Sequence, residues 1–170
     1  MVIWIIGLSG SGKSTLANEI VLRANKEKNK IILLDGDLIR EIFGHDLGYS
    51  KKDRFKNAQR ICQLGKFLND QGFNVVTAIL SLFPENREWN RSNIKNYYEV
   101  FIDAPLEDLI KRDSKGLYEK FSKGEISEVA GMDIEFLKPE RADLVIKNTD
   151  SKESLLNYAE LIAKKFSLLK

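Results

Sequence analysis

The 170-residue chain contains one cysteine, one histidine and no marked excess of either charge. Because Cys62 has no second cysteine to pair with, the chain cannot form an internal disulfide, which fits a reducing compartment. Lysine and arginine total 27 against 25 aspartate and glutamate residues, so the composition does not indicate a basic surface for nucleic acid. The apolar run at residues 1–6 is too short for a signal peptide or a membrane span. We therefore expect a cytoplasmic protein that binds neither nucleic acid nor a membrane.

The sequence also lacks repeats, low-complexity stretches and linkers, so we expect a single domain over residues 1–170. Short apolar runs rich in valine, isoleucine and aromatic residues alternate with longer segments of helical period. These runs are typical of buried parallel strands, and they lie at residues 2–6, 30–35, 74–80, 97–103 and 142–148. Strands that alternate with helices predict an α/β fold with a central parallel sheet. The irregular segment 113–141 is expected to form a lid or a binding loop.

The stretch GLSGSGKST, residues 7–15, fits the phosphate-binding pattern G-x-x-x-x-G-K-[ST] and stands between a predicted strand and a predicted helix. Its glycines leave room for backbone N–H groups to surround phosphates, and the following helix directs the positive end of its dipole at the same oxygens. Lys13 supplies a positive charge where negative charge develops, and the Ser14 hydroxyl is a ligand for Mg²⁺. The loop therefore predicts a nucleoside triphosphate site.

Two carboxylates, Asp35 and Asp37, end the second predicted strand. In a parallel sheet this position lies in the crevice where ligands bind, beside the phosphates. Carboxylates there can hold Mg²⁺-bound water or accept a proton from an attacking hydroxyl. A switch GTPase would need an Asn-Lys-x-Asp element to read its base, and that string does not occur. The pattern favours a kinase.

The next segment carries candidate groups for binding an acceptor. Arg40 follows the carboxylates on a predicted short helix, and its planar guanidinium suits an anionic group. Ser50 with Asp53 three residues later predicts a helix that begins near residue 51. Tyr49 then stands at a loop tip, where its ring can offer a face to a base. On the helix itself, Asn57 lies on a polar face together with Asp53.

Several motifs taken together resemble the adenylylsulfate (APS) kinase family. They are GLSGSGKST, LDGDLIR, LGYSKKDRFKNAQR, VVTAILS, RDSKGLYEKFSKGEI, GMD and KPERADL, in that order, and the resemblance covers about residues 2 to 150. The resemblance implies a three-layer P-loop kinase fold with a mobile lid, and a homodimer. It also implies transfer of the γ-phosphate of ATP to the ribose 3′-hydroxyl of a small nucleotide, with Mg²⁺.

The resemblance assigns roles to individual residues. The ATP phosphate cradle is formed by Gly7, Ser9, Gly10, Ser11, Gly12, Lys13, Ser14 and Thr15. Arg112 of the lid is expected to meet the phosphates or the base of ATP, and Ser14 and Asp35 are the expected Mg²⁺ ligands. The catalytic residues are expected to be Lys13, Asp35, Asp37 and Lys115. Which of the two aspartates is the general base stays open.

The acceptor site that the resemblance implies is formed by Asp37, Arg40, Tyr49, Arg54, Asn57, Ser81, Leu82, Lys115, Val129 and Gly131. Ser81 matches a serine once proposed in the family as a phospho-acceptor. Positioning the acceptor is the role that we favour for it, because direct in-line transfer needs no covalent intermediate.

The chain departs from the family on the acceptor side alone. Val129 replaces a phenylalanine that would complete a two-ring sandwich around adenine. The sequence Ser81-Leu82-Phe83-Pro84 lacks the arginine of the family's Ser-Pro-aromatic-Arg stretch, and residues 132–137 also differ. A slot with Tyr49 opposite an aliphatic residue better matches a smaller pyrimidine.

We therefore favour the branch of the family that phosphorylates cytidine diphosphoramidate in the synthesis of bacterial capsule phosphoramidates. The alternative is an APS kinase that makes 3′-phosphoadenylylsulfate, since valine still provides an apolar wall. A non-catalytic nucleotide-binding module is another alternative, although it predicts damage to Lys13, Ser14 or the carboxylates, and all of these are intact. A metabolite kinase unrelated to nucleotides would have no use for Tyr49 and Arg54 in their present spacing.

Overall fold

The computed structural model describes residues 1–113, 115–148 and 152–168. Its centre is a sheet of five strands that pair in parallel in the order β2-β3-β1-β4-β5. The strands are β1 (Val2–Ile6), β2 (Ile31–Asp35), β3 (Asn74–Ile79), β4 (Tyr97–Asp103) and β5 (Leu144–Lys147). Each lies within a predicted apolar run, so the predicted α/β class and the parallel sheet are confirmed.

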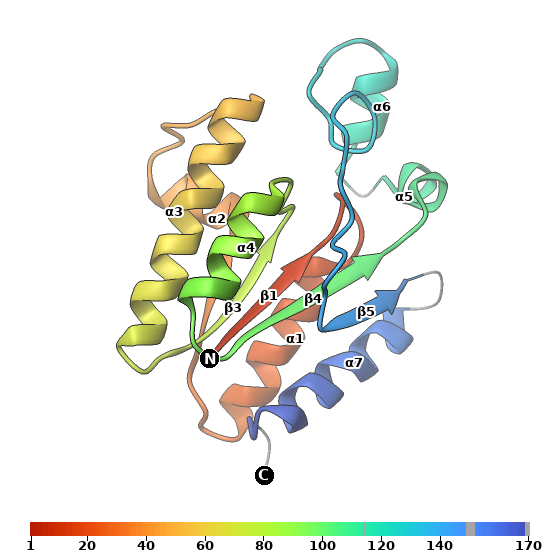
Figure 1. Cartoon of the computed structure of the whole chain (residues 1–170). Helices are drawn as coiled ribbons and strands as arrows, with labels where there is room; N and C mark the ends of the chain where they lie inside the picture. The colour runs from red at the N-terminus through yellow and green to blue at the C-terminus, as the bar shows by residue number, and fades with distance from the viewer. Residues whose placement is uncertain (114, 149–151, 169–170) are drawn as a thin grey trace.

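Helices cover both faces of the sheet, which gives three layers (Figure 1). On one face, α1 (Lys13–Lys26) and α7 (Lys152–Lys165) pack together over Ile3 and Ile5 of β1. On the other face lie α2 (Gly36–Ile42), α3 (Lys51–Asp70) and α4 (Pro84–Asn93), which cover Val2, Trp4 and Ile6. All residues of β1 are buried because successive side chains point to opposite faces and both faces are covered.

The order of the strands determines where a ligand can bind. β1 lies between β3 and β4, so the connections that follow β1 and its neighbours diverge at the carboxyl end of the sheet. Such a switch point opens a crevice in doubly wound α/β folds. The predicted phosphate loop joins β1 to α1 there, and Asp35 ends β2 at the same edge.

The segment 113–141 contains more structure than the sequence indicated. After α5 (Leu106–Arg112), a short helix α6 (Leu117–Ser122) projects beyond the ends of β1 and β4 (Figure 1). A tight turn follows, in which the Asp133 carboxylate accepts hydrogen bonds from the backbone N–H groups of Glu128 (2.7 Å) and Val129 (2.6 Å). The mobility of this lid stays a prediction. Within the described ranges, none of the helices has both the length and the apolar character that a membrane crossing needs.

The predicted start of α3 is confirmed, and it can be tested by mutation. The Ser50 hydroxyl accepts a hydrogen bond from the Asp53 N–H at 3.1 Å. We expect Ser50→Ala to lower the free energy of unfolding by about 1 kcal/mol, as for other N-cap serines. The exposed Ser92 within α4 provides the control, because Ser92→Ala is expected to change the free energy of unfolding by less than about 0.5 kcal/mol. Urea denaturation measures both, and equal effects would contradict the capping role.

Candidate active site

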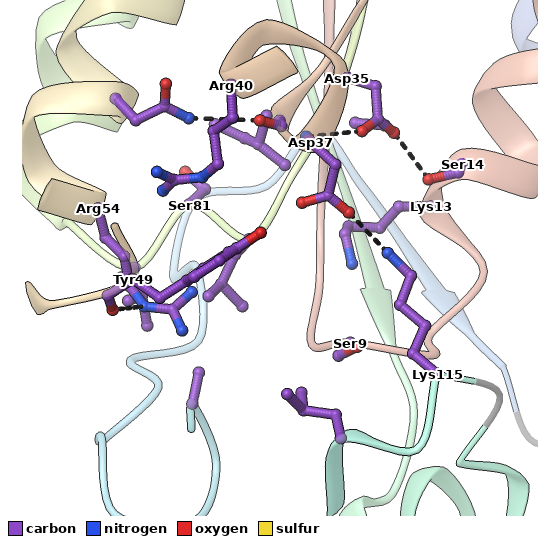
Figure 2. A pocket seen from close by; sticks show the side chains of 18 of the residues that line it. Ser9, Lys13, Ser14, Asp35, Asp37, Arg40, Tyr49, Arg54, Ser81 and Lys115 are labelled. Carbon is purple, nitrogen blue, oxygen red and sulfur yellow. Dashed lines mark hydrogen bonds and ion pairs between the residues drawn. The ribbon is translucent and has the colours of Figure 1, made fainter. Parts of the chain in front are cut away.

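The structure has a cavity of about 670 Å³ at the carboxyl end of the sheet. Its wall is formed by the phosphate loop, the start of α2, one face of α3, the segment after β3, and the lid segment around α6. Predicted site residues on this wall are Ser9, Gly10, Gly12, Lys13, Ser14, Thr15, Asp35, Asp37, Arg40, Tyr49, Arg54, Asn57, Ser81, Leu82, Lys115 and Val129. The structure thus brings groups from both halves of the chain to one cavity (Figure 2).

The phosphate loop is compact because of its glycines. A Cβ atom on Gly7 would lie 2.5 Å from the Ser11 hydroxyl and 2.8 Å from the Ile102 carbonyl oxygen. Gly12 precedes α1 with a φ of 98°, which side chains with a Cβ rarely adopt. Gly7 and Ser11 are buried behind the loop and do not line the cavity, so their expected contribution to the cradle is structural support.

Lys13 begins α1, and its ammonium group is turned back onto the loop. Its Nζ donates a hydrogen bond to the Leu8 carbonyl oxygen at 2.7 Å. Burial, and next the nearby charge of Lys115, lowers the pKa of Lys13 to about 8. Among the described residues no carboxylate is hydrogen-bonded to this half-buried cation, so it is poised to bind an anion, because a phosphate would restore the lost solvation.

Asp35 and Asp37 have different hydrogen-bond partners, although they are only two residues apart in the sequence. Asp35 is the N-cap of α2, and its Oδ1 accepts from the Asp37 N–H at 2.9 Å. Its Oδ2 accepts from the Ser14 hydroxyl at 2.8 Å, which joins β2 to the start of α1. Asp37 instead pairs with Lys115 of the lid segment, with Oδ2 and Nζ 2.7 Å apart (Figure 2). This bond raises the pKa of Lys115.

Tyr49 lies on the opposite side of the cavity from Ser14 (Figure 2). Its ring is 56% exposed, and the guanidinium carbons of Arg40 and Arg54 lie 4.8 and 5.4 Å from the ring centre. Arg40 donates to the carbonyl oxygens of Leu47 (3.0 Å) and Gly48 (2.7 Å).

Arg54 also binds backbone. Its Nε donates to the Tyr49 carbonyl oxygen at 2.7 Å, and its Nη2 donates to that of Glu128 at 2.9 Å. Burial, with the nearby charge of Arg40 as the next cause, lowers the pKa of Arg54. The two arginines therefore hold the Tyr49 loop in place, a role that the sequence did not indicate. Their contact with an acceptor stays a prediction.

The floor of the acceptor side is buried. Asn57 donates from Nδ2 to the Gly36 carbonyl oxygen at 3.5 Å, and its Oδ1 finds no partner among the described residues. The Ser81 hydroxyl accepts from the Trp4 indole N–H at 3.3 Å, and its residue is 5% exposed. An enclosed hydroxyl that already accepts a hydrogen bond fits a positioning role better than a phospho-acceptor role.

Two further predicted residues do not line the cavity. Arg112 lies at the end of α5, and its Nη2 is 3.5 Å from the Asn148 carbonyl oxygen, to which it donates. Gly131 lies in the turn closed by Asp133, with the side chains of Leu8 and Leu106 3.2 and 3.3 Å from the position of a Cβ atom. Contact of Arg112 with ATP stays a prediction.

Some wall residues were missed from the sequence. Lys120, Ile126 and Ser127 of the lid segment line the cavity. Lys120 and Ile126 lie within the motif RDSKGLYEKFSKGEI, but no site role was predicted for them. A usable signal was present for α6, because Asp113 accepts from the N–H groups of Tyr118 (3.2 Å) and Glu119 (2.9 Å) as a capping residue does.

The model of the Adenylylsulphate kinase family matches residues 1–147. The chain belongs to the adenylylsulfate kinase family. It is 44% identical over 167 residues to the cytidine diphosphoramidate kinase of Campylobacter jejuni, covering 98% of this chain and 96% of that one. It is also 41% identical over 147 residues to the adenylyl-sulfate kinase of Paraburkholderia xenovorans, covering 86% of this chain and 82% of that one.

A solved structure agrees with these matches. The structure of the Mycobacterium tuberculosis APS kinase CysC in complex with AMPPNP and APS aligns with a TM-score of 0.88 at 33% identity. The alignment covers 98% of this chain and 96% of that chain. The family resemblance, the P-loop kinase fold and the prediction of a kinase are therefore confirmed.

The lowered pKa of Lys13 predicts how nucleotide binding depends on pH. Above pH 8 the ammonium in the empty site loses its proton. Because phosphates favour the protonated form, binding must then take up a proton, so affinity for AMPPNP should fall by up to about tenfold per pH unit. Below pH 8 Lys13 is charged and contributes no pH dependence. Lys115 stays charged throughout because its pKa is raised.

Lys13→Arg is the matched variant for this prediction, because arginine keeps its charge across the range. Isothermal titration calorimetry between pH 7 and pH 10 should show the loss of affinity in the wild-type protein and a flat profile in Lys13→Arg. Parallel losses in both proteins would contradict the assignment to Lys13.

Proposed function

We propose that the protein transfers the γ-phosphate of ATP to the ribose 3′-hydroxyl of cytidine diphosphoramidate. The triphosphate lies on the loop of residues 7–15, against Lys13, and the acceptor lies between Tyr49 and Val129. The similarity to the Campylobacter jejuni relative supports this choice of acceptor. The observation that carries the proposal is the acceptor wall, which presents the exposed ring of Tyr49 and the aliphatic side chain of Val129.

The side chains near the phosphate loop fit Mg²⁺. Ser14 and Asp35 offer two oxygen ligands 2.8 Å apart on the cavity wall. Mg²⁺ is commonly held by one or two carboxylates together with phosphates and water, without a complete protein cage. No cluster of three or more acidic, histidine or cysteine side chains occurs among the described residues. We assign Ser14 and Asp35 as the protein ligands of an ion that would neutralise charge on the phosphates.

The other carboxylate, Asp37, is not hydrogen-bonded to Ser14 and pairs with Lys115 instead. We assign it as the base that accepts the proton of the ribose hydroxyl, since Asp35 is committed to Ser14 and the cap of α2. Lys115, which pairs with Asp37, would move to the transferring phosphate when substrates separate the pair. The Lys13 ammonium already lies against the phosphate loop, where it donates to the Leu8 carbonyl oxygen. Both cations then stabilise charge as it develops on the phosphoryl oxygens.

The acceptor base is read by one exposed ring and one aliphatic side chain. Of the two aromatic residues on the wall, Phe83 is buried and packs edge-on against Phe55, whereas Tyr49 is exposed. Val129 is 1% exposed and belongs to a buried cluster with Leu109. A single stacking surface suits a pyrimidine, which gains less from a second ring than a purine does.

The alternative acceptor is APS. It is favoured by the 41% identity to the Paraburkholderia xenovorans adenylyl-sulfate kinase and by the apolar character of Val129, which can still contact adenine. A cytoplasmic location, a homodimer and a place in capsule phosphoramidate synthesis are the further predictions that accompany the main proposal.

The proposal is tested by an ADP-release assay with cytidine diphosphoramidate, APS, CDP and CMP as acceptors. We expect kcat/KM to be highest for cytidine diphosphoramidate, because it alone combines the pyrimidine with the amidate end group. A higher value for APS would establish the alternative. No ADP release with any of the four would contradict both.

A variant tests the role of Val129 in reading the base. A phenylalanine is too large for the buried cluster and would extend into the cavity opposite Tyr49. We expect Val129→Phe to raise the kcat/KM ratio of APS to cytidine diphosphoramidate about 2- to 10-fold, the effect of one stacked ring. Val145→Phe, on the exposed edge strand β5, is the control and should leave the ratio unchanged. An unchanged ratio in Val129→Phe would show that this residue does not read the base.

A further inference from the structure

Three carbonyl groups of the phosphate loop accept side-chain hydrogen bonds, two of them from outside the loop. The Leu8 carbonyl oxygen accepts from Lys13, as described above. The Ser9 carbonyl oxygen accepts from the Tyr118 hydroxyl of α6 at 3.1 Å. The Ser11 carbonyl oxygen accepts from Asn148 Nδ2, just after β5, at 2.8 Å. Segments more than 100 residues away in the sequence therefore fix the backbone of the loop.

These bonds determine where the N–H groups point. A trans peptide is planar, with its C=O and N–H directed to opposite sides. Because Tyr118 holds the Ser9 carbonyl outside the loop, the Gly10 N–H is directed away from Tyr118. Gly10 has a φ of 76° and no side chain, so nothing within the residue itself opposes rotation of this peptide. The Ser11 N–H closes this turn onto the Leu8 carbonyl oxygen at 3.2 Å, and the Tyr118 hydroxyl holds its central peptide from outside the loop.

The position of the Tyr118 hydroxyl is itself fixed. Gly116, with a φ of 63°, is the N-cap of α6, and the Asp113 carboxylate accepts a hydrogen bond from the Tyr118 N–H. The Tyr118 side chain is 3% exposed and belongs to a buried cluster with Leu109 and Val129. Burial, and next the charge of Asp113, raises the pKa of Tyr118 to about 12, so its hydroxyl stays a donor at neutral pH.

We propose that Tyr118 is a positioning residue for phosphate binding: its hydroxyl, supplied by the lid segment, orients the Ser9–Gly10 peptide so that the Gly10 N–H can bind a phosphate oxygen. The bond between the Tyr118 hydroxyl and the Ser9 carbonyl oxygen then joins the lid segment to the phosphate loop. Val129, in the same cluster as Tyr118, connects this junction to the acceptor wall. The inference rests on the proposed ATP site and holds for either acceptor.

Tyr118→Phe removes the hydroxyl and keeps the buried ring. We expect the dissociation constant for AMPPNP to rise about 2- to 10-fold, the effect of losing one hydrogen bond. Tyr97→Phe is the matched control. The Tyr97 hydroxyl donates to Glu99 at 2.8 Å, and Tyr97 lies at the amino end of β4 and does not line the cavity. Its loss should leave the dissociation constant for AMPPNP unchanged.

The backbone amide signal of Gly10 gives a second readout, because it reports on the Ser9–Gly10 peptide itself and a general loss of stability would not shift it selectively. In ¹H–¹⁵N spectra of the full chain, this signal should shift in Tyr118→Phe and stay in place in Tyr97→Phe. Equal dissociation constants for the wild-type protein and Tyr118→Phe would overturn the inference, as would a weakening that Tyr97→Phe reproduces. If the wild-type protein itself failed to bind AMPPNP, the proposed function would fail and the inference with it.

Discussion

The hydrogen bond between Ser14 and Asp35 joins the two halves of the site. Ser14 stands at the start of α1, directly after the phosphate loop, and Asp35 stands at the end of β2. β3 lies between β2 and β1 in the sheet, so this bond connects the ends of two strands that are not neighbours. The bond holds Asp35 next to the phosphate loop. In the proposed site, its two oxygens would share one Mg²⁺ position between the triphosphate and the acceptor hydroxyl near Asp37.

The rest of the cavity is organised around that junction. Lys13 and Lys115 lie near it and come from different elements, one from α1 and the other from the lid segment (Figure 2). The acceptor side is built differently, from a loop whose path is held by arginine bonds to backbone carbonyl oxygens. In the proposed site, cations would therefore stabilise the transferring phosphate directly on one side, and on the other they hold the ring proposed to stack on the base. The acceptor wall could then change without a change in the residues proposed for the chemistry.

The parts of the molecule that could be predicted from the sequence are those set by local patterns. All five strands, the loop at residues 7–15 and the start of α3 at Lys51 follow from periodicity, glycine spacing and a capping serine. What could not be predicted depends on the path of distant segments. Arg54 binds the Glu128 carbonyl oxygen across 74 residues, and Tyr118 binds Ser9 across 109. Helix α6 was missed because six residues are too few for a helical period to be recognised, which left the nearby Asp113 as its one local signal.

The central claim is direct in-line transfer between ATP on the phosphate loop and a ribose held beside Tyr49. A crystal structure of the protein with AMPPNP, Mg²⁺ and cytidine diphosphoramidate bound together tests it most directly. The account predicts the ribose 3′-oxygen about 3–3.5 Å from the γ-phosphorus and in line with the bridging nitrogen. It also predicts Asp37 within hydrogen-bond distance of that oxygen. A ribose that lies far from the γ-phosphorus while the lid segment covers both ligands would contradict the account.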